Sequence, residues 1–277
     1  MKSGFIFFLA FGISWATNEN VFSRLVDDLF DDAGYDKDVI PMKKPADKTS
    51  NVNAINIAVG LSVISMDLDP AGILSASTWL RTTWSDFRLQ WDPEQYQGLD
   101  NIKIPSSKIW RPDLSVYNAA DFGSGSFRDL YSSGPSNAIV YSSGKVLWIP
   151  PLPMKVDCHH EQVVAVTDKN DPQEGNIKIG SWTYDGFSLN LTAYDNEEYL
   201  DLGDMSKNSP YVVTSQQGDA LNSKYYACCA EPYWSMNYRF TLQRAFTIQD
   251  GEKVFNKSPE DLEKLFEQYQ TTFTGNK

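Results

Sequence analysis

The chain has 277 residues, 42% of them hydrophobic and 13% aromatic, and a formal net charge of −12 at neutral pH. This length suits one large β domain, and the acidic balance disfavours nucleic acid and anionic lipid surfaces as partners. The two histidines, His159 and His160, are adjacent, a poor arrangement for a nucleophile with a base or for spaced metal ligands. We therefore expect no enzyme, no metal site and no cofactor.

The first residues have the pattern of a secretory signal peptide. A lysine precedes an apolar run at residues 5–13, and small residues follow at a cleavage site. We expect residues 1–16 to be removed, leaving a secreted extracellular domain at residues 17–247 and an extension at residues 248–277. Elsewhere no apolar run approaches the roughly 20 residues that a membrane span requires.

A short amphipathic helix is expected after the leader. Between residues 20 and 31, helical spacing places four apolar residues on one face: Phe22, Leu25, Leu29 and Phe30. The linker that follows contains Pro41 and Pro45, which mark an irregular segment.

From Ile55 the period changes to two, which is typical of a half-buried strand, and a slip after Val63 indicates a β-bulge. Further runs of this kind are expected as strands at residues 76–91, 137–149, 177–183, 187–194, 211–215 and 232–247. Many short strands with little helix predict an all-β fold, a β-sandwich.

The C-terminal extension returns to helical signals. Ser258 followed by Pro259 and two acids is a typical helix start. An apolar stripe then predicts an amphipathic helix over residues 258–272, packed on the domain or on a neighbouring chain. The stripe consists of Leu262, Leu265, Phe266 and Tyr269.

Two adjacent cysteines, Cys228 and Cys229, stand between Tyr226 and Tyr233. Three cysteines in an oxidising compartment predict one disulfide and one leftover thiol. A reduced pair and a bond from Cys158 to either neighbour are alternatives. We favour the bond between Cys228 and Cys229, which stiffens the loop that carries it and leaves Cys158 unpaired.

Two further groups of residues have simple interpretations. The acidic run at residues 195–204 could hold a cation, but such a run is more typical of a solvated loop. Asn190 and Asn256 begin glycosylation motifs, and Asn190 lies on the polar side of its expected strand.

Several motifs rich in aromatic residues lie beside turns rather than inside apolar runs. They are Trp79–Asp86, Ile109–Leu114 with Tyr117 shortly after it, and Gly180–Tyr184. Together with the cysteine pair, these motifs resemble the extracellular ligand-binding domain of nicotinic acetylcholine receptors, and most of all the soluble acetylcholine-binding proteins. The resemblance covers residues 20–247. It implies a ten-stranded immunoglobulin-like β-sandwich after an N-terminal helix, assembled as a homopentamer that binds acetylcholine, nicotine-like and other cationic ligands between subunits.

The resemblance also assigns roles to particular residues. One subunit would supply a principal face made of Tyr117, Trp182, Tyr226 and Tyr233, with the Cys228–Cys229 disulfide at the tip of a closing loop. Its neighbour would supply a complementary face made of Trp79, Ile139, Leu147 and Ile149. Aromatic faces suit a quaternary ammonium, which cannot donate a strong hydrogen bond. We expect Trp182 to be the main platform and Asp113 to bond the backbone beside it.

The sequence departs from the family at two places. Cys158 matches the first cysteine of the signature loop, but its partner position, near Gly175, has no cysteine. Lys178 matches a family lysine whose acidic partner is here replaced by Ser235. The alternative function is a truncated ectodomain of a cholinergic ligand-gated channel. A carbohydrate-binding β-sandwich is a weaker alternative, because it would not explain the cysteine pair.

Overall fold

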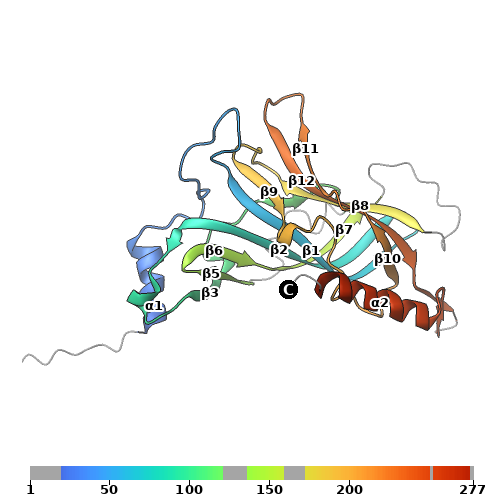
Figure 1. The fold of residues 1–277 in the computed structure, drawn as a ribbon. Coiled ribbons are helices and arrows are strands. Elements are labelled where there is room, and N and C mark those ends of the chain that lie inside the picture. Colours follow the sequence, from blue (N-terminus) through green and yellow to red (C-terminus); the bar gives the residue numbers. More distant parts are fainter. Residues whose placement is uncertain (1–19, 121–135, 159–171, 250–251, 275–277) are drawn as a thin grey trace, which may run out of the picture.

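The computed structural model describes residues 20–120, 136–158, 172–249 and 252–274 (Figure 1). The expected leader and both histidines lie outside these ranges. Within them, two helices flank a β-sandwich, as the sequence predicts, and they lie at different ends of the molecule. Neither described helix is long and apolar enough to cross a membrane.

The helices and strands follow the chain in a simple order. The helical elements are α1 (Val21–Asp27) with a π-helical continuation η1 (Asp28–Asp32), the 3₁₀ turns η2 (Pro93–Tyr96), η3 (Ser106–Lys108) and η4 (Tyr194–Asn196), and α2 (Pro259–Thr274). The strands are β1 (Ile55–Leu68), β2 (Ile73–Gln90), β3 (Asn101–Pro105), β4 (Leu114–Val116), β5 (Asn137–Tyr141), β6 (Ser143–Trp148), β7 (Pro151–Asp157), β8 (Gln173–Ser181), β9 (Leu189–Ala193), β10 (Tyr211–Gln216), β11 (Leu221–Tyr225), β12 (Pro232–Arg244), β13 (Phe246–Gln249) and β14 (Glu252–Phe255).

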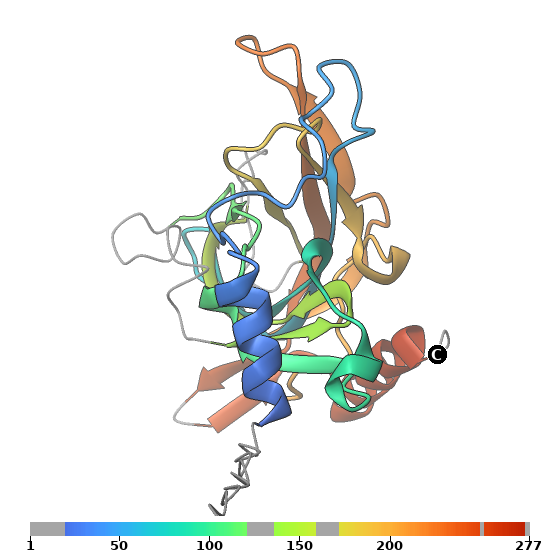
Figure 2. The same ribbon diagram turned by 90° about the vertical axis from the view of Figure 1, so that its left-hand side faces the viewer.

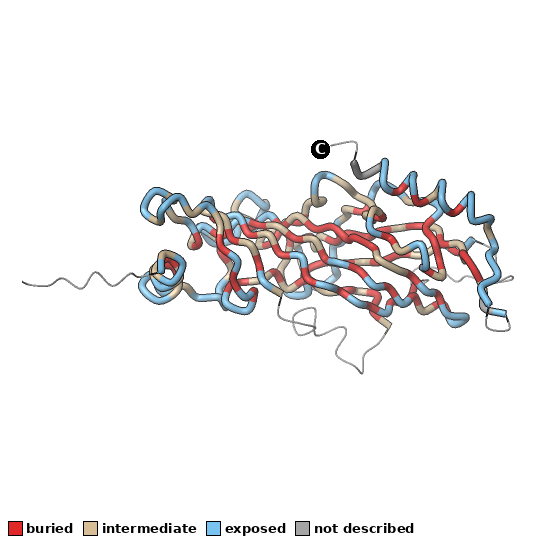
Figure 3. The backbone as a smooth tube through the Cα atoms, turned by 90° about the horizontal axis from the view of Figure 1, so that it is seen from below, coloured by how far each residue is buried: buried red, intermediate tan, exposed pale blue. Residues whose placement is uncertain are grey.

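Twelve of the described strands form one hydrogen-bonded network that folds into the sandwich. Its order is β3-β5-β6-β2-β1-β10-β12-β8-β4, with β7 beside β2, β9 parallel to β1 and β11 beside β12. The pair Met66–Tyr211 joins the β1 half to the β10 half. Figure 3 shows the buried residues concentrated along the middle of the molecule. The expected bulge is confirmed as a register shift between Val63 and Ser65.

The strand boundaries differ from the sequence prediction where turns and prolines interrupt the pattern. The single strand expected at residues 137–149 is a hairpin, β5–β6, because Gly144 adopts a positive φ of 81° at its turn. Strand β7 was missed because Pro151 and Pro153 disfavour a strand. They are tolerated here, since the buried residues alternate with them and β7 pairs with β2.

Helix α1 is capped by Asn20, whose side chain accepts a hydrogen bond from the Phe22 backbone N–H at 2.9 Å. Leu25 and Leu29 are buried in the core, as the helical spacing predicts. The same prediction is wrong for Phe22, whose side chain is 52% exposed. The buried face of this short helix is therefore centred on its second turn.

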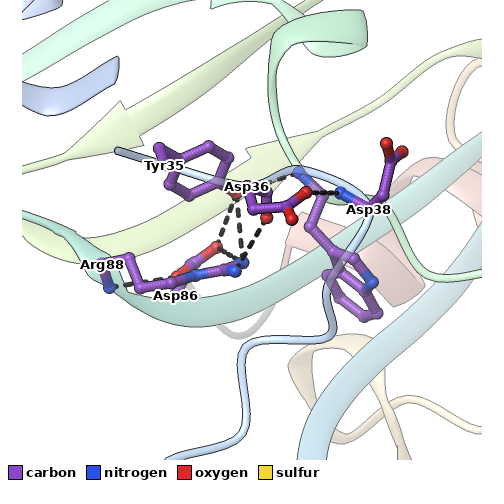
Figure 4. Close-up of polar contacts among 6 residues, drawn as sticks. Tyr35, Asp36, Asp38, Asp86 and Arg88 are labelled. Atoms are coloured by element: carbon purple, nitrogen blue, oxygen red, sulfur yellow. Dashed lines mark hydrogen bonds and ion pairs between the residues drawn. The ribbon is translucent and has the colours of Figure 1, made fainter. Parts of the chain in front are cut away.

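A buried ionic cluster ties the segment after α1 to strand β2 (Figure 4). The Asp86 carboxylate is fully buried, and it accepts hydrogen bonds from the Tyr35 hydroxyl at 2.7 Å and from the Arg88 guanidinium at 2.8 and 2.9 Å. Arg88 also donates to the Asp36 carbonyl, and the Trp110 N–H donates to the Tyr35 oxygen. Burial raises the pKa of Tyr35, so its hydroxyl remains a donor to Asp86.

Helix α2 packs on its own domain along the expected stripe. Ser258 caps it by accepting from the Asp261 N–H at 3.1 Å. The Tyr269 hydroxyl donates to the Val213 carbonyl on β10, and Lys207 forms an ion pair with Glu263. Leu262, Phe266 and Tyr269 are buried, and Leu265 is partly buried. The described contacts thus place this helix on the domain itself.

Candidate functional site

Four aromatic side chains gather where three strands end. Tyr117 follows β4, Trp182 follows β8, and Tyr226 and Tyr233 come from the β11–β12 hairpin, which projects beyond the rest of the sandwich (Figures 1 and 2). The Tyr117 and Trp182 rings meet edge to face at 6.1 Å, and the Tyr226 and Tyr233 rings do so at 5.5 Å. Trp182 is 60% exposed and Tyr226 is 40% exposed, so the cluster is open to solvent. We call these four residues the aromatic cluster.

Tyr117 is fixed at the base of the cluster by strand β8. Its backbone N–H donates to the Lys178 carbonyl at 2.8 Å, and its hydroxyl donates to the Ser181 carbonyl. Gly180 leaves room for this ring, since a Cβ there would lie 2.6 Å from the hydroxyl oxygen. Burial is the main cause that raises the pKa of Tyr117, and the neighbouring groups Tyr226, Asp113 and Tyr233 raise it further. The hydroxyl is therefore a neutral hydrogen-bond donor.

Asp113 holds the turn that carries Trp182. One carboxylate oxygen accepts from the Ser181 hydroxyl at 2.5 Å, and the other accepts from the Thr183 N–H at 2.8 Å and from the Thr183 hydroxyl. The Asp113 carbonyl accepts from the Trp182 N–H at 3.2 Å. The expected bonding of Asp113 to the backbone beside Trp182 is confirmed. Charge-assisted bonds of this kind are stronger than neutral ones, so they fix the position of the indole.

The hairpin that carries Tyr226 and Tyr233 is closed by the disulfide between Cys228 and Cys229, which confirms that pairing. Strands β11 and β12 are in register from Leu221 opposite Met236 up to the tip. Near its tip the hairpin is joined to the loop that carries Trp182, because the Gly186 N–H donates to the carbonyl of Pro232, which lies opposite Tyr225, at 2.6 Å. The two parts of the aromatic cluster are thus linked through backbone hydrogen bonds.

Cys158 is unpaired, as expected, and its side chain is buried. Burial raises the pKa of its thiol to about 12. A Cβ placed on Gly175 would lie 1.9 Å from the Cys158 sulfur. Gly175 therefore faces Cys158 directly, at the position where the family's second cysteine was expected, and the sulfur occupies the space that a side chain would need.

The second departure concerns Lys178. In the antiparallel pairing of β8 with β12, Lys178 lies opposite Asn237, and Ser235 lies opposite Gly180. Ser235 is buried. The register thus keeps position 235 close to Tyr117 and the start of the Trp182 turn.

The expected complementary residues lie on one face of a different part of the sheet. Trp79 is on β2, Ile139 on β5 and Leu147 on β6, and Ile149 follows β6. Leu147 lies opposite both Thr83 and Ile139, so these side chains share the face of Trp79, since alternate residues point the same way. The alternate residues Leu80, Thr82 and Trp84 are buried in the core. Trp79 is 40% exposed and Ile149 is 39% exposed.

These two groups are separated within one chain. In the strand order, β1, β10 and β12 stand between β2 and β8. The aromatic cluster and the Trp79 face are therefore presented from different parts of the sheet. A single chain thus carries both the aromatic cluster and the Trp79 face, on strands that are not neighbours in the sheet.

One structural feature beside Trp79 was not predicted from the sequence. Arg81, two residues along β2, forms an ion pair with Asp201 at 3.0 Å, lies 4.0 Å from Glu197 and stacks over Tyr194 at 4.9 Å. The acidic segment is thus pinned to β2, and among the described residues no acid, cysteine or histidine group could hold a metal ion. Desolvation raises the pKa of Glu197, and Arg81 partly offsets this effect. Arg81 belongs to the Trp79–Asp86 motif, but its ion-pair partner, Asp201, is far away along the chain.

The glycosylation motifs differ in their surroundings. Asn190 lies on β9, half-buried, and its amide donates to Asn56 at 2.7 Å on the neighbouring strand. Asn256 is exposed after β14. Attachment of a glycan at Asn190 would replace one of the two hydrogens of the amide that donates to Asn56, whereas Asn256 is more accessible.

Comparison with known proteins agrees with this architecture. Residues 22–246 match the model of the neurotransmitter-gated ion-channel ligand-binding domain. The chain belongs to this family. It is 32% identical over 223 residues to the neuronal acetylcholine receptor subunit alpha-2 of Gallus gallus, with 80% of this chain and 38% of that protein covered. It is also 32% identical over 228 residues to the acetylcholine receptor subunit alpha-like of Manduca sexta, covering 80% of this chain and 41% of that protein.

A nematode relative gives a similar result. The acetylcholine receptor subunit alpha-type acr-16 of Caenorhabditis briggsae is 32% identical over 208 residues, with 73% of this chain and 38% of that protein covered. The chain thus spans about two fifths of the length of these relatives. What it shares with them is the ligand-binding domain, a family of binding domains rather than enzymes.

Proposed function

We propose that this chain is a secreted, soluble acetylcholine-binding protein. It captures acetylcholine, nicotine-like and other cationic ligands in aromatic cages at the subunit interfaces of a homopentamer, without catalysis. The observation that carries the proposal is the aromatic cluster, in which Trp182 is held by Asp113 and remains 60% exposed. A packing role alone would bury such a ring rather than fix it in solvent.

The chemistry of the cluster suits an organic cation. The ring face of a tryptophan or tyrosine attracts a cation electrostatically, and each desolvated contact is worth on the order of 2 kcal/mol. Tyr226 and Tyr233 come from a hairpin stiffened by a disulfide, so the hairpin can cover a ligand without changing its own shape. No proton transfer or nucleophile is required for this capture.

The second support is the separation of the cluster from the Trp79 face. A heterologous interface joins different surfaces of two identical chains and closes into a ring when the rotation permits. In such a ring, Trp79 of one subunit would complete the cage around a cation bound at Trp182 of the next. The exposed side chains Trp79 and Ile149 would become buried on assembly.

The alternative is the truncated ectodomain of a cholinergic ligand-gated channel. It is favoured by the receptor subunits that match this chain, each of which is longer than the chain itself. A transcript that encodes an apolar run after Phe246 would support this alternative. The ligand site and its residues would be the same in both cases.

The first test is equilibrium binding of acetylcholine and nicotine, followed by tryptophan fluorescence, to the secreted protein and to Trp182→Ala. We expect saturable binding to the unaltered protein and a loss of about 100-fold in affinity for the variant, because it removes the main cation platform. Both proteins should elute at the same size. Absence of a response to either ligand at millimolar concentration would refute the cholinergic assignment.

A mixing experiment tests whether the site lies between subunits. Trp182→Ala and Trp79→Ala chains are refolded or expressed together in equal amounts. Because random assembly pairs an intact cluster with an intact Trp79 face at about one quarter of the interfaces, binding should reappear with that stoichiometry. Each variant alone should bind weakly. If the mixture binds no better than the separate variants, the proposal that the site lies between subunits is wrong.

A further inference from the structure

We propose that Lys224 is a tethered cation that competes with the ligand for the aromatic cluster. The inference rests on the proposed function and concerns the same site. It assigns to this lysine a role in specificity: it weakens the binding of small monovalent cations and leaves the binding of uncharged ligands of the same shape unchanged.

The geometry places the Lys224 ammonium against one ring of the cluster, Tyr226. Its nitrogen lies 5.0 Å from the centre of the Tyr226 ring, within the distance of a cation–π contact. The backbone reinforces this position, because Lys224 lies directly opposite Tyr233 in the β11–β12 pairing. Residues directly opposite in an antiparallel pair bring their Cβ atoms to about 5 Å. The lysine thus neighbours both tyrosines of the hairpin, one through its ammonium and the other through the strand pairing.

Among the described residues, the contact of the Lys224 ammonium is with the Tyr226 ring. Within the described ranges, no carboxylate forms an ion pair with its ammonium, whereas Lys207 pairs with Glu263 and Arg239 with Asp219. The Tyr226 ring is 40% exposed and makes its edge-to-face contact with Tyr233. The ring is therefore one of few partners for the ammonium, and it belongs to the group proposed to receive the ligand's charge.

Two like charges repel at such short range. A ligand ammonium that packs on the Tyr226 ring comes close to Lys224 and is repelled by its charge. The ring face that Lys224 occupies is also unavailable to the ligand's charge, whereas an uncharged ligand gains no cation–π energy from that face and so loses none. Lys224 therefore raises the dissociation constant of cationic ligands, and the effect decreases with salt because Lys224 is exposed.

The test compares Lys224→Met, which keeps a chain of similar length, with the unaltered protein. The probes are tetramethylammonium, acetylcholine and its uncharged carbon isostere 3,3-dimethylbutyl acetate. At low salt we expect Lys224→Met to bind both cations about 3- to 10-fold more tightly, in line with the strength of an exposed cation–π contact. The isostere should bind with unchanged affinity, and the gain for the cations should shrink in high salt.

Two control variants separate the charge of Lys224 at this site from the general effect of a lost lysine. Lys253→Met removes an equal charge from another cation–π pair, in which the Lys253 nitrogen lies 4.3 Å from the Phe246 ring centre. It should leave affinity unchanged. Lys224→Arg keeps the charge and should bind as the unaltered protein does. Unfolding in urea should give the same midpoint for all of them, so that any difference reports the site.

The outcomes separate this inference from the proposed function. If the unaltered protein binds acetylcholine and Lys224→Met binds it equally or more weakly, the tethered-cation role is refuted while the cholinergic site stands. If the gain extends to the uncharged isostere, Lys224 acts by bulk and the electrostatic role is refuted. If neither protein binds any cation, the proposed function itself fails, and the inference fails with it.

Discussion

The aromatic cluster and the Trp79 face are built in different ways. The cluster is assembled within one chain, because Tyr117 and Trp182 contact each other and Asp113 holds the turn that carries Trp182. The Trp79 face is a row of apolar side chains on neighbouring strands, fixed by the register of the sheet. One group is positioned by specific hydrogen bonds and the other by strand pairing. Mutation of a residue that holds the aromatic cluster in place, such as Asp113, should therefore lower ligand affinity. At the Trp79 face, only mutation of the side chains that line it should do so.

The largest effect is expected for Asp113→Ala. The change removes the acceptor for the Ser181 hydroxyl and the Thr183 N–H, each bond being worth about 1.5–3 kcal/mol when one partner is charged. The Trp182 turn loses its fixed position, so affinity for acetylcholine should fall about 100-fold. Isothermal titration measures the affinity, and urea unfolding measures the accompanying loss of stability, about 3 kcal/mol.

The matched control for Asp113 is Asp185, which lies in the loop that carries Trp182, between β8 and β9. Asp185 accepts hydrogen bonds from the Phe187 and Ser188 N–H groups, at 2.8 and 3.0 Å, but both belong to its own turn. Asp185→Ala should lower affinity only a few-fold, because the link from β4 to the Trp182 turn remains. Equal losses for Asp113→Ala and Asp185→Ala would mean that the loop as a whole, rather than its tie to β4, positions Trp182.

A smaller effect is expected for Trp79→Ala. The side chain is 40% exposed, so its removal should cost no more than about 1 kcal/mol of unfolding free energy. Affinity should fall about 30-fold, the equivalent of one desolvated cation–π contact of about 2 kcal/mol. Phe87→Ala is the control, since Phe87 is on the same face of β2 and is 37% exposed. A loss of affinity in Phe87→Ala as large as in Trp79→Ala would show that β2 as a whole is perturbed.

Arg81→Met addresses the support beside Trp79. It keeps the length of the side chain but leaves the half-buried Asp201 and Glu197 without their cation, which should lower the unfolding free energy by about 3 kcal/mol. Affinity should change only a few-fold, because the strand register that places Trp79 is untouched. Arg239→Met, which breaks the more exposed pair with Asp219, should cost less than about 1 kcal/mol. An affinity loss in Arg81→Met above that of Trp79→Ala would contradict the proposed difference between the two groups.

The sequence predicted those features that depend on local pattern. Alternation gave the long strands and the bulge after Val63, and the stripe from Leu262 to Tyr269 gave α2. The sequence could not predict that Phe22 stays exposed, because helical spacing does not say how much of a short helix reaches the core. The site residues came from the family resemblance. Contacts over long separations, such as Arg81 with Asp201, leave no periodic signal.

The smallest effect on binding is expected at Cys158, which lies outside both groups. Its folded pKa is raised to about 12 from an ordinary value of 9.0. Below pH 9 the thiol is neutral in the folded and in the unfolded chain, so the contribution of the neutral thiol to the unfolding free energy is fully present. Between pH 9 and 12 the unfolded chain releases the proton while the folded chain keeps it, so the unfolding free energy falls by up to about 1.4 kcal/mol per pH unit.

Cys158→Ala removes this pH dependence and no other. The free energy of unfolding should therefore decline less steeply above pH 9 in the variant than in the unaltered protein, as urea titrations at several pH values would measure. Buried tyrosines such as Tyr238 add their own decline at higher pH in both proteins, so the difference between the curves isolates the thiol. Affinity for acetylcholine at neutral pH should be the same in both. Parallel curves would mean that Cys158 is exposed to solvent, and a change of affinity would mean that the Cys158–Gly175 region is coupled to the aromatic cluster.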